Sequence, residues 1–311
     1  MIKQFANSVI ENVSKVIIGK EDVIQLALVA LLAEGHVLFE DVPGVGKTTL
    51  SKALARSLGC TFSRIQFTPD LLPSDVTGIY WYNQKSQSFE FRPGPIMGQI
   101  ILADEINRAT PRTQSALLEA MQERQTTIDR DTYPLPRPFL VLATQNPIEM
   151  EGTFPLPEAQ VDRFLMKISL GYPDEAQENE FLLRYARQDP LIELETVTSP
   201  EEIVQMQQAV RDVQMDDKVR AYLVQVVRAT REHPAADLGV SPRGSLALYR
   251  ASQARAAVLG RDYVLPDDIK ALTPTVLTHR IHISPQTRLR GRTPEEILQE
   301  IISQVPAPVF Q

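Results

Sequence analysis

Residues 41–48 read Asp-Val-Pro-Gly-Val-Gly-Lys-Thr, and residues 100–105 read Ile-Ile-Leu-Ala-Asp-Glu. The first stretch follows a short apolar run and precedes a helical pattern, which is the setting of a phosphate-binding loop. Asp41 stands where the first glycine of such a loop is usual, but the positions that approach phosphate are retained. These positions are Gly44, Gly46, Lys47 and Thr48. The second stretch is an apolar strand that ends in two carboxylates, so the two stretches together predict a site that binds and hydrolyses ATP.

Each residue type has an expected task at this site. Backbone N–H groups at the start of a helix attract phosphate, and the Lys47 ammonium would reach the outer phosphates. The Thr48 hydroxyl and the Asp104 carboxylate would hold Mg²⁺, while Glu105 would orient and activate the attacking water. The residues expected to contact ATP are Pro43, Gly44, Val45, Gly46, Lys47, Thr48 and Thr49.

The composition is that of a soluble globular protein. The chain has 311 residues, which favours two domains, and 43% of them are hydrophobic and 23% charged. Its longest apolar stretch, residues 26–33, is far shorter than the ~20 residues that a membrane-spanning helix needs. No signal peptide is evident, and the single cysteine, Cys60, excludes an internal disulfide. We therefore expect a cytoplasmic protein.

The net charge of −7 is spread evenly along the chain, with no basic domain or tail. Proteins that bind nucleic acid normally show a positive surface, because lysine and arginine make the phosphate contacts. The charge therefore argues against nucleic acid as a partner.

The pattern of apolar residues predicts an α/β domain over residues 1–172. A first helix is expected to run to about residue 17, and a second to begin at Glu21 and end at Gly35. A third should follow the phosphate loop and stop at Gly59. The expected strands are residues 36–40, 61–67, 99–103, 138–144 and 165–170. Because strands and helices alternate, we predict a parallel sheet that is covered on both faces.

Two further segments alternate in polarity and predict β-hairpins inserted into this layer. One pairs residues 78–83 with residues 88–92 and carries aromatic side chains on both strands, and the other is residues 125–135. The core of an α/β domain does not need such hairpins, so they are candidates for functional contacts. They could equally serve to cover an edge of the sheet.

From residue 174 onward nearly every segment has a helical pattern. Three segments begin with serine or threonine followed by proline, which is a start signal for a helix. They are residues 199–202, 241–243 and 293–296. The sequence therefore predicts a small all-helical domain over residues 173–311.

The strand at residues 138–144 is followed by Gln145 and Asn146. An amide at this edge of the sheet could hold the attacking water or contact the γ-phosphate. Asn146 and Pro147 also have the composition of a simple turn. The nearby Glu105 favours the functional interpretation.

Four longer motifs surround these residues. They are Asp-Glu-Ile-Asn-Arg-Ala at residues 104–109, Gln-Ser-Ala-Leu-Leu-Glu-Ala-Met-Gln-Glu at 114–123, Ala-Thr-Gln-Asn-Pro at 143–147 and Gly-Thr-Phe-Pro-Leu-Pro-Glu-Ala-Gln-Val-Asp-Arg-Phe at 152–164. In this order they resemble the MoxR family of AAA+ ATPases, and the match covers nearly the whole chain. The resemblance implies an α/β P-loop sandwich of three layers with a parallel sheet, inserted hairpins and a small helical lid domain.

The resemblance implies further site residues by their positions in the motifs. Asn146 matches the polar residue called sensor 1, Arg163 matches an arginine finger that reaches a neighbouring subunit's ATP, and Arg243 matches sensor 2 in the lid. Ile18 and Gly19 resemble the segment that packs on adenine in relatives, although they would serve equally well as packing at a helix end. The competing candidates for the finger are Arg108, Arg112 and Arg130.

Because such a finger completes a neighbour's site, the resemblance also implies a homo-oligomeric ring, which we expect to be a hexamer. The family is similar to chaperone-like factors that mature or activate other protein complexes, often with partners of the von Willebrand factor A type. Two alternatives stay open. Stimulation of the ATPase by single-stranded DNA would favour a nucleic-acid motor, and support of porphyrin metallation would favour the ATPase subunit of a metal chelatase.

Overall fold

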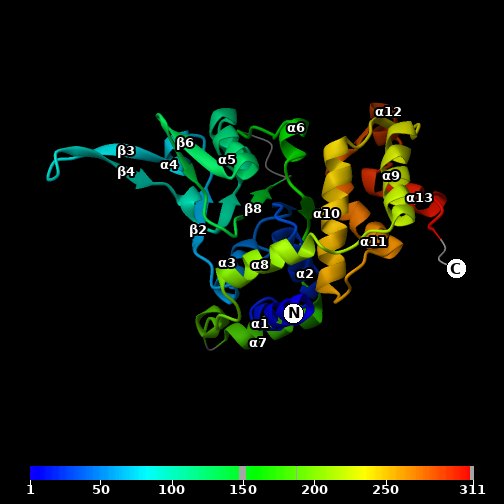
Figure 1. Ribbon diagram of the computed structural model, residues 1–311, viewed down its shortest axis with the longest axis horizontal. Coiled ribbons are helices and arrows are strands. Elements are labelled where there is room, and N and C mark those ends of the chain that lie inside the picture. Colours follow the sequence, from blue (N-terminus) through cyan, green and yellow to red (C-terminus); the bar gives the residue numbers. More distant parts are fainter. Residues whose placement is uncertain (147–151, 187, 309–311) are drawn as a thin grey trace.

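The structure is a computed structural model that describes residues 1–146, 152–186 and 188–308 (Figure 1). Pro147, which follows the predicted amide at the strand end, lies outside these residues. An α/β part and a helical part lie side by side, with the long helix α10 (Pro242–Val258) at their junction (Figure 1). Within the described residues, no helix combines the length and the apolar character needed to cross a bilayer.

The α/β part is built on a five-stranded sheet with the strand order β2-β5-β8-β1-β9. The strands are β1 (Val37–Glu40), β2 (Phe62–Gln66), β5 (Ile100–Asp104), β8 (Leu140–Gln145) and β9 (Met166–Ile168). All neighbouring strands run parallel, so the predicted parallel sheet is confirmed. The carboxyl ends of β1, β5 and β8 therefore meet at one edge of the sheet.

Helices cover both faces of this sheet. They are α1 (Ile2–Ser14), α2 (Glu21–Leu32) and α3 (Lys47–Ser57) on one face, and α4 (Pro73–Thr77) and α5 (Pro111–Glu123) on the other. Leu102 of β5 lies in the core beneath α1–α3. Its neighbours Ile101 and Ala103 lie in the core beneath α5. β5 is therefore apolar on both sides, which is why the sequence shows a continuous apolar run here.

Both inserted hairpins are present as predicted. They are β3 (Gly78–Asn83) with β4 (Ser88–Pro93), and β6 (Gln125–Ile128) with β7 (Asp131–Pro134). The first hairpin extends away from the body of the molecule (Figure 1). The Tyr80 hydroxyl on this hairpin donates a hydrogen bond to the carboxylate of Asp131 at 2.5 Å. The Phe91 ring stacks on Tyr133 with 4.3 Å between centroids, so the two hairpins brace each other.

The helical part confirms the predicted helix starts. Its helices after α8 (Pro200–Val210) are α9 (Asp217–Glu232), α10, α11 (Pro266–Leu277), α12 (Pro285–Leu289) and α13 (Pro294–Gln304). Ser199 and Thr293 form capping boxes at the starts of α8 and α13. α10 also begins where expected, but Ser241 does not cap it. Its hydroxyl instead donates to the carboxylate of Asp162 in the α/β part at 3.3 Å.

This part is not entirely helical, contrary to the prediction. β10 (Ala236–Leu238) and β11 (His282–Ile283) form a short antiparallel ladder. The ladder joins the loop between α9 and α10 to the segment that follows α11. Strands of two or three residues are too short to show an alternating pattern, so the sequence did not reveal them.

The chain between β9 and α9 returns across the α/β part. The predicted division after residue 172 falls in the coil between β9 and α7 (Glu175–Tyr185). Beyond α7, the Arg56 guanidinium of α3 donates to the carbonyl of Leu194 at 2.5 Å. On α8, the Gln207 amide donates to the carbonyl of Leu31 on α2 at 2.7 Å. Residues from the second half of the chain thus help to hold the helices next to the sheet.

His36 lies just before β1 and ties three elements of the α/β part together. Its Nδ1 accepts a hydrogen bond from the backbone N–H of Val141 at 3.1 Å. The proton must then be on Nε2, which donates to the carbonyl of Met121 at 3.1 Å. Burial, together with the nearby charge of Arg124, lowers the pKa of His36 to about 4. The imidazole is therefore neutral near neutral pH.

We expect the free energy of unfolding to decrease between about pH 7 and about pH 4, partly through His36. An unfolded histidine has a pKa of 6.5. Below that pH the unfolded chain binds a proton that the folded chain does not, so stability is lost until the pH reaches the folded pKa. The complete effect is on the order of 3 kcal/mol. Urea unfolding across this pH range measures it.

The variant His36→Gln should weaken this pH dependence, because the titrating group is removed. The matched control is His282→Gln, which removes an imidazole that is 29% exposed and should retain the part of the pH dependence that His36 contributes. An unchanged pH dependence in His36→Gln would contradict the assigned role of this buried imidazole.

Candidate nucleotide-binding site

The predicted phosphate-binding loop connects β1 to α3. Gly44 and Gly46 have φ angles of 86° and 95°, a region that residues with a Cβ rarely adopt. A Cβ at either position would meet nothing within 4 Å, so the backbone conformation alone requires glycine. Lys47 is the first residue of α3, and the N–H groups at this helix start can therefore point at an anion.

Asp41, which replaces the usual first glycine, anchors the start of the loop. The carboxylate is buried and accepts hydrogen bonds from the Ser169 hydroxyl at 2.8 Å and the backbone N–H of Leu170 at 2.5 Å. The N–H of Gly171 adds a longer bond at 3.3 Å. The substitution therefore ties the loop to the chain that leaves β9, a role that the sequence alone did not reveal.

The Lys47 side chain folds back over its own loop. Its ammonium donates to the carbonyls of Asp41 at 3.0 Å and Val42 at 3.1 Å. Burial lowers the pKa of Lys47, while the charges of Asp41, Asp104 and Glu105 act in the opposite direction. The ammonium thus lies between the loop and the carboxylates at the end of β5, the position from which it can contact phosphate.

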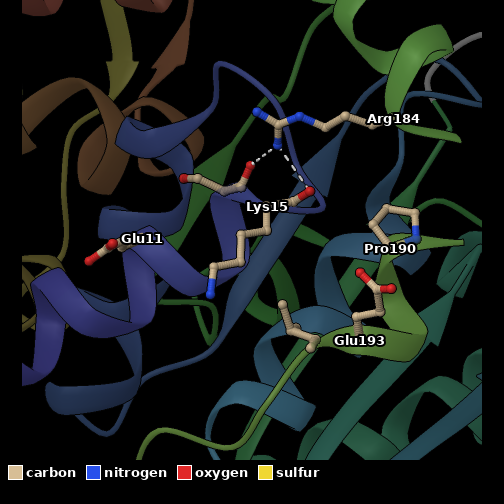
Figure 2. Close-up of a pocket in the computed structure, with 7 residues that line it drawn as sticks. Glu11, Lys15, Arg184, Pro190 and Glu193 are labelled. Carbon is tan, nitrogen blue, oxygen red and sulfur yellow. Dashed lines mark hydrogen bonds between the residues drawn. The ribbon is translucent and has the colours of Figure 1, made fainter.

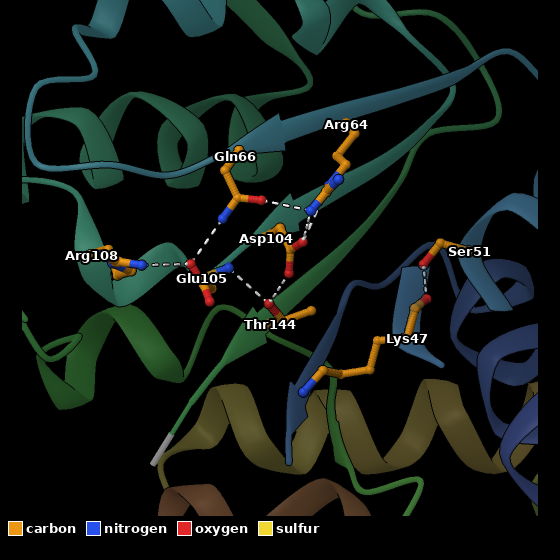
Figure 3. A network of polar contacts seen from close by, with 8 residues as sticks. All are labelled: Lys47, Ser51, Arg64, Gln66, Asp104, Glu105, Arg108 and Thr144. Atoms are coloured by element: carbon orange, nitrogen blue, oxygen red, sulfur yellow. Dashed lines mark hydrogen bonds and ion pairs between the residues drawn. The ribbon is translucent and has the colours of Figure 1, made fainter. Parts of the chain in front are cut away.

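Asp104 ends β5 and is held from two sides (Figure 3). The Thr144 hydroxyl at the end of β8 donates to its Oδ1 at 2.7 Å. On the other side, the Arg64 guanidinium forms an ion pair with its Oδ2 at 2.6 Å. The carboxylate is therefore fixed at the sheet edge and faces the phosphate loop.

At Glu105, directly after β5, the backbone turns away from the direction of the strand. Its φ of 56° lies in the left-handed region, which costs a residue other than glycine roughly 1 kcal/mol. The backbone N–H of Glu105 donates to the Thr144 hydroxyl at 2.8 Å, and its Oε2 accepts from the Gln66 amide at 2.9 Å. Arg108 pairs with the same oxygen at 3.2 Å, as Figure 3 shows. Such strain at a polar, well-held residue is typical of a functional position.

Most of the residues predicted to contact ATP and Mg²⁺ converge on one cavity of about 320 Å³. It is lined by Pro43, Gly44, Gly46, Lys47, Thr48, Thr49, Asp104, Glu105, Thr144 and Asn146. Loop amides, an ammonium, a hydroxyl and two carboxylates therefore surround one space. This donor set suits a nucleotide triphosphate with a divalent cation.

Three predicted contacts are not among the described residues that line this cavity. Val45 packs against the apolar core instead. Ile18 and Gly19 lie beside α7, where the Gly19 carbonyl accepts a long hydrogen bond from the Gln177 amide at 3.5 Å. Gly19 has a φ of 64°, and a Cβ there would collide with Gln177. Packing against α7 thus accounts for this glycine, and a contact with adenine stays a prediction.

A larger cavity of about 510 Å³ lies between α1 and α7 (Figure 2). The Arg184 guanidinium donates there to the carbonyls of Ser14 at 2.7 Å and Lys15 at 3.0 Å. These carbonyls belong to the end of α1, where helix groups lack partners within the helix. The cavity contains none of the predicted site residues, so size does not identify the functional cavity here.

Arg163 and Arg243 lie together, but they do not line the cavity of their own phosphate loop. They line a separate cavity of about 250 Å³ at the end of α5, the start of β9 and the first turns of α10. The further arginines that line it are Arg124, Arg250 and Arg280. Throughout the part of the chain that the structure describes, the guanidinium groups of Arg163 and Arg243 have no hydrogen-bond or ion-pair partner.

The residues that support the carboxylates were not predicted from the sequence. Arg64 and Gln66 project from the same face of the edge strand β2, and Thr144 comes from β8. The spacing of Arg64 and Gln66, two apart on a predicted strand, was the available signal. It could not be used without knowing that β2 pairs with β5.

Comparisons with known proteins agree with this geometry. The family model of ATPases associated with various cellular activities (AAA) matches residues 36–166, and the model of the AAA lid domain matches residues 228–301. The protein YeaC of Bacillus subtilis, of uncharacterised function, is 54% identical over 96% of this chain and 94% of its own length. Chaperone MoxR1 of Mycobacterium tuberculosis is 42% identical over 95% of this chain and 80% of its own length.

A crystal structure of a candidate ATPase from Cytophaga hutchinsonii has a similar fold throughout. It superposes with a TM-score of 0.93 at 40% identity and covers 99% of this chain and 96% of its own. The helical part that follows the α/β part is included in this match. Together with the phosphate loop, the paired carboxylates and the lid, these findings show that the chain belongs to the MoxR family of AAA+ ATPases.

Proposed function

We propose that the chain hydrolyses ATP in the cavity at the carboxyl edge of its sheet. The observation that carries this proposal is the convergence of Lys47, Asp104 and Glu105 around about 320 Å³ of space at the start of α3. The helix start and Lys47 would bind the phosphates, which stabilises their negative charge. Mg²⁺ would be held by Thr48 and Asp104 and would neutralise charge on the outer phosphates.

Glu105 is the group best placed to accept a proton from the attacking water. Its Oε2 is held by Gln66 and Arg108, while the strained backbone directs the carboxylate into the cavity. Asn146 lines the same cavity and would orient the water or contact the γ-phosphate. The two groups come from the ends of adjacent strands, so the sheet sets the distance between them.

We further propose that the site is completed by a neighbouring copy of the chain. Arg163 and Arg243 are accessible side chains that line a cavity other than that of their own phosphate loop. Two cations without a partner among the described residues suit the phosphates of another subunit's ATP, where they would stabilise negative charge. Arg163 would act as the finger and Arg243 as sensor 2. Sites that each need a neighbour favour a closed homo-oligomeric ring, and we propose a hexamer.

The output that we propose is chaperone-like remodelling or activation of protein complexes in the cytoplasm. The first hairpin presents Trp81, Tyr82 and Phe89, which are 44%, 49% and 70% exposed. Exposed aromatic side chains on a projecting hairpin suit contact with protein surfaces. The net charge of −7 disfavours a nucleic acid. A von Willebrand factor A-type protein is the partner that the family resemblance suggests.

We predict that Lys47→Ala weakens ATP binding about 10- to 100-fold, because a charged hydrogen bond to phosphate is lost. Titration with a fluorescent ATP analogue measures the affinity. Lys52→Ala is the matched control, since Lys52 is an exposed lysine on the same helix. Unchanged affinity in Lys47→Ala, or an equal loss in both variants, would show that ATP does not bind at this helix start.

We predict that Glu105→Gln keeps ATP binding and loses turnover by about 10²- to 10⁴-fold, because proton acceptance by the carboxylate is lost. Release of phosphate under saturating ATP measures turnover. Glu123→Gln, an exposed carboxylate at the end of α5, should behave as wild type. Normal turnover in Glu105→Gln would assign the proton acceptor to another group.

We predict that Arg163→Ala binds ATP normally but loses turnover by about 10³- to 10⁵-fold, the range attributed to an arginine finger. Wild-type turnover per subunit should rise with protein concentration as the ring assembles. Arg228→Ala, which removes a lid arginine that is 66% exposed, is the control. Turnover that depends on neither protein concentration nor Arg163 would argue for a self-sufficient site or another finger, and size-exclusion chromatography separates a preassembled ring from a monomer.

A further inference from the structure

A buried arginine of the helical part forms hydrogen bonds with the residues on both sides of Arg163. Arg280 lies in the short 3₁₀ helix after α11, and its side chain is 2% exposed. Its Nε donates to the carboxylate of Asp162 at 2.7 Å. A terminal nitrogen donates to the carbonyls of Asp162 at 3.1 Å and Phe164 at 2.5 Å. The residues before and after Arg163 are thus held by one guanidinium group.

The same ion pair holds the segment that carries Arg243. The Ser241 hydroxyl donates to the free oxygen of the Asp162 carboxylate at 3.3 Å. Gly244 packs on the Arg280 side chain so closely that a Cβ there would lie 2.9 Å from its Cδ. Arg243 therefore sits between two residues that touch the Arg280–Asp162 pair, just as Arg163 sits between two residues that Arg280 holds.

Stability alone does not explain why the charged side chain of Arg280 is buried at this position. Removing a guanidinium group from water is costly, and a well-packed apolar side chain of similar volume is often as stable. What an ion pair adds is fixed direction, because each of its bonds prefers a narrow geometry. Burial lowers the pKa of Arg280 to about 10, with Asp162 opposing the shift, so the group is still charged near neutral pH.

We propose that Arg280 and Asp162 are positioning residues that hold Arg163 and Arg243 as one rigid pair across the junction of the two parts. Movement of the helical part then carries both arginines together toward or away from the neighbour's ATP. The proposal rests on the proposed function, since it assumes that these arginines serve a shared site. It adds that the helical lid and the arginine finger, Arg163, move together.

The test is Arg280→Lys, which keeps the charge but cannot make the same set of bonds. We expect kcat to fall about 10- to 100-fold, the cost of a displacement near 1 Å, with the affinity for ATP unchanged. The matched control is Arg255→Lys. Arg255 pairs with the fully buried carboxylate of Asp268 inside the helical part, and it lies near the opposite end of α10 from Arg243. It should change stability without this fall in kcat.

Mixed rings distinguish two causes of lost turnover. One is misplaced arginines facing a neighbour's ATP, and the other is a defect in the variant's own cavity. A Glu105→Gln subunit should hydrolyse ATP only at its strongly reduced residual rate but presents intact arginines, and an Arg280→Lys subunit has an intact cavity. Turnover per Arg280→Lys subunit should therefore rise severalfold when the two variants are mixed and allowed to exchange subunits. No rise, or a loss of ATP affinity in Arg280→Lys, would overturn the proposal.

Ser241→Ala keeps the proposal testable if Arg280→Lys does not fold. It deletes one hydroxyl that holds Asp162, and we expect a severalfold fall in kcat at unchanged ATP affinity, so wild-type kcat would overturn the proposal. Arg163→Ala measured in parallel shows which idea has failed. Normal turnover in Arg163→Ala refutes the shared site itself, whereas loss in Arg163→Ala with normal turnover in Arg280→Lys refutes only the positioning role.

Discussion

The parallel pairing of β5 with β8 is the constraint on which the nucleotide site depends. Ala103 lies opposite Ala143 in this pairing, so the next residue of each strand arrives at the sheet edge together. Thr144 then bridges the two carboxylate residues, donating to Asp104 and accepting from the N–H of Glu105. A slip of one residue would send these side chains to the opposite face. The placement of Asp104, Glu105 and Thr144 at the sheet edge therefore depends on the register between β5 and β8.

The phosphate loop is tied to the same framework by Asp41. Its carboxylate binds the residues that leave β9, which pairs with β1 on the other side of the sheet. The loop is thus fixed at both ends, by Asp41 at the start and by α3 at the end. Asp41 therefore holds together the start of the loop and the segment that leaves β9 for α7.

Features of the fold and the site that depend on a pattern of neighbouring residues could be predicted from the sequence. The glycines and Lys47 of the loop, the strand that ends in Asp104 and Glu105, and both hairpins depend on neighbouring residues and appear as predicted. The supports of the carboxylates depend on strand order, which no local pattern encodes. Gln66 contacts Glu105 across 39 positions of sequence, and Arg280 contacts Asp162 across 118. At Ile18 the local pattern is present but does not decide between two roles, since an apolar residue before glycine fits helix packing and nucleotide contact equally well.

The arrangement of charge explains why one chain would present an incomplete site. Arg163 and Arg243 lie beside Arg280, and each guanidinium group raises the cost of placing the next one nearby. Asp162 and the surrounding carbonyls offset the charge of Arg280, which is the buried member of the group. The accessible pair has no such compensation within the described residues. A neighbour's phosphates would supply it, so assembly and the charge of the bound nucleotide would stabilise each other.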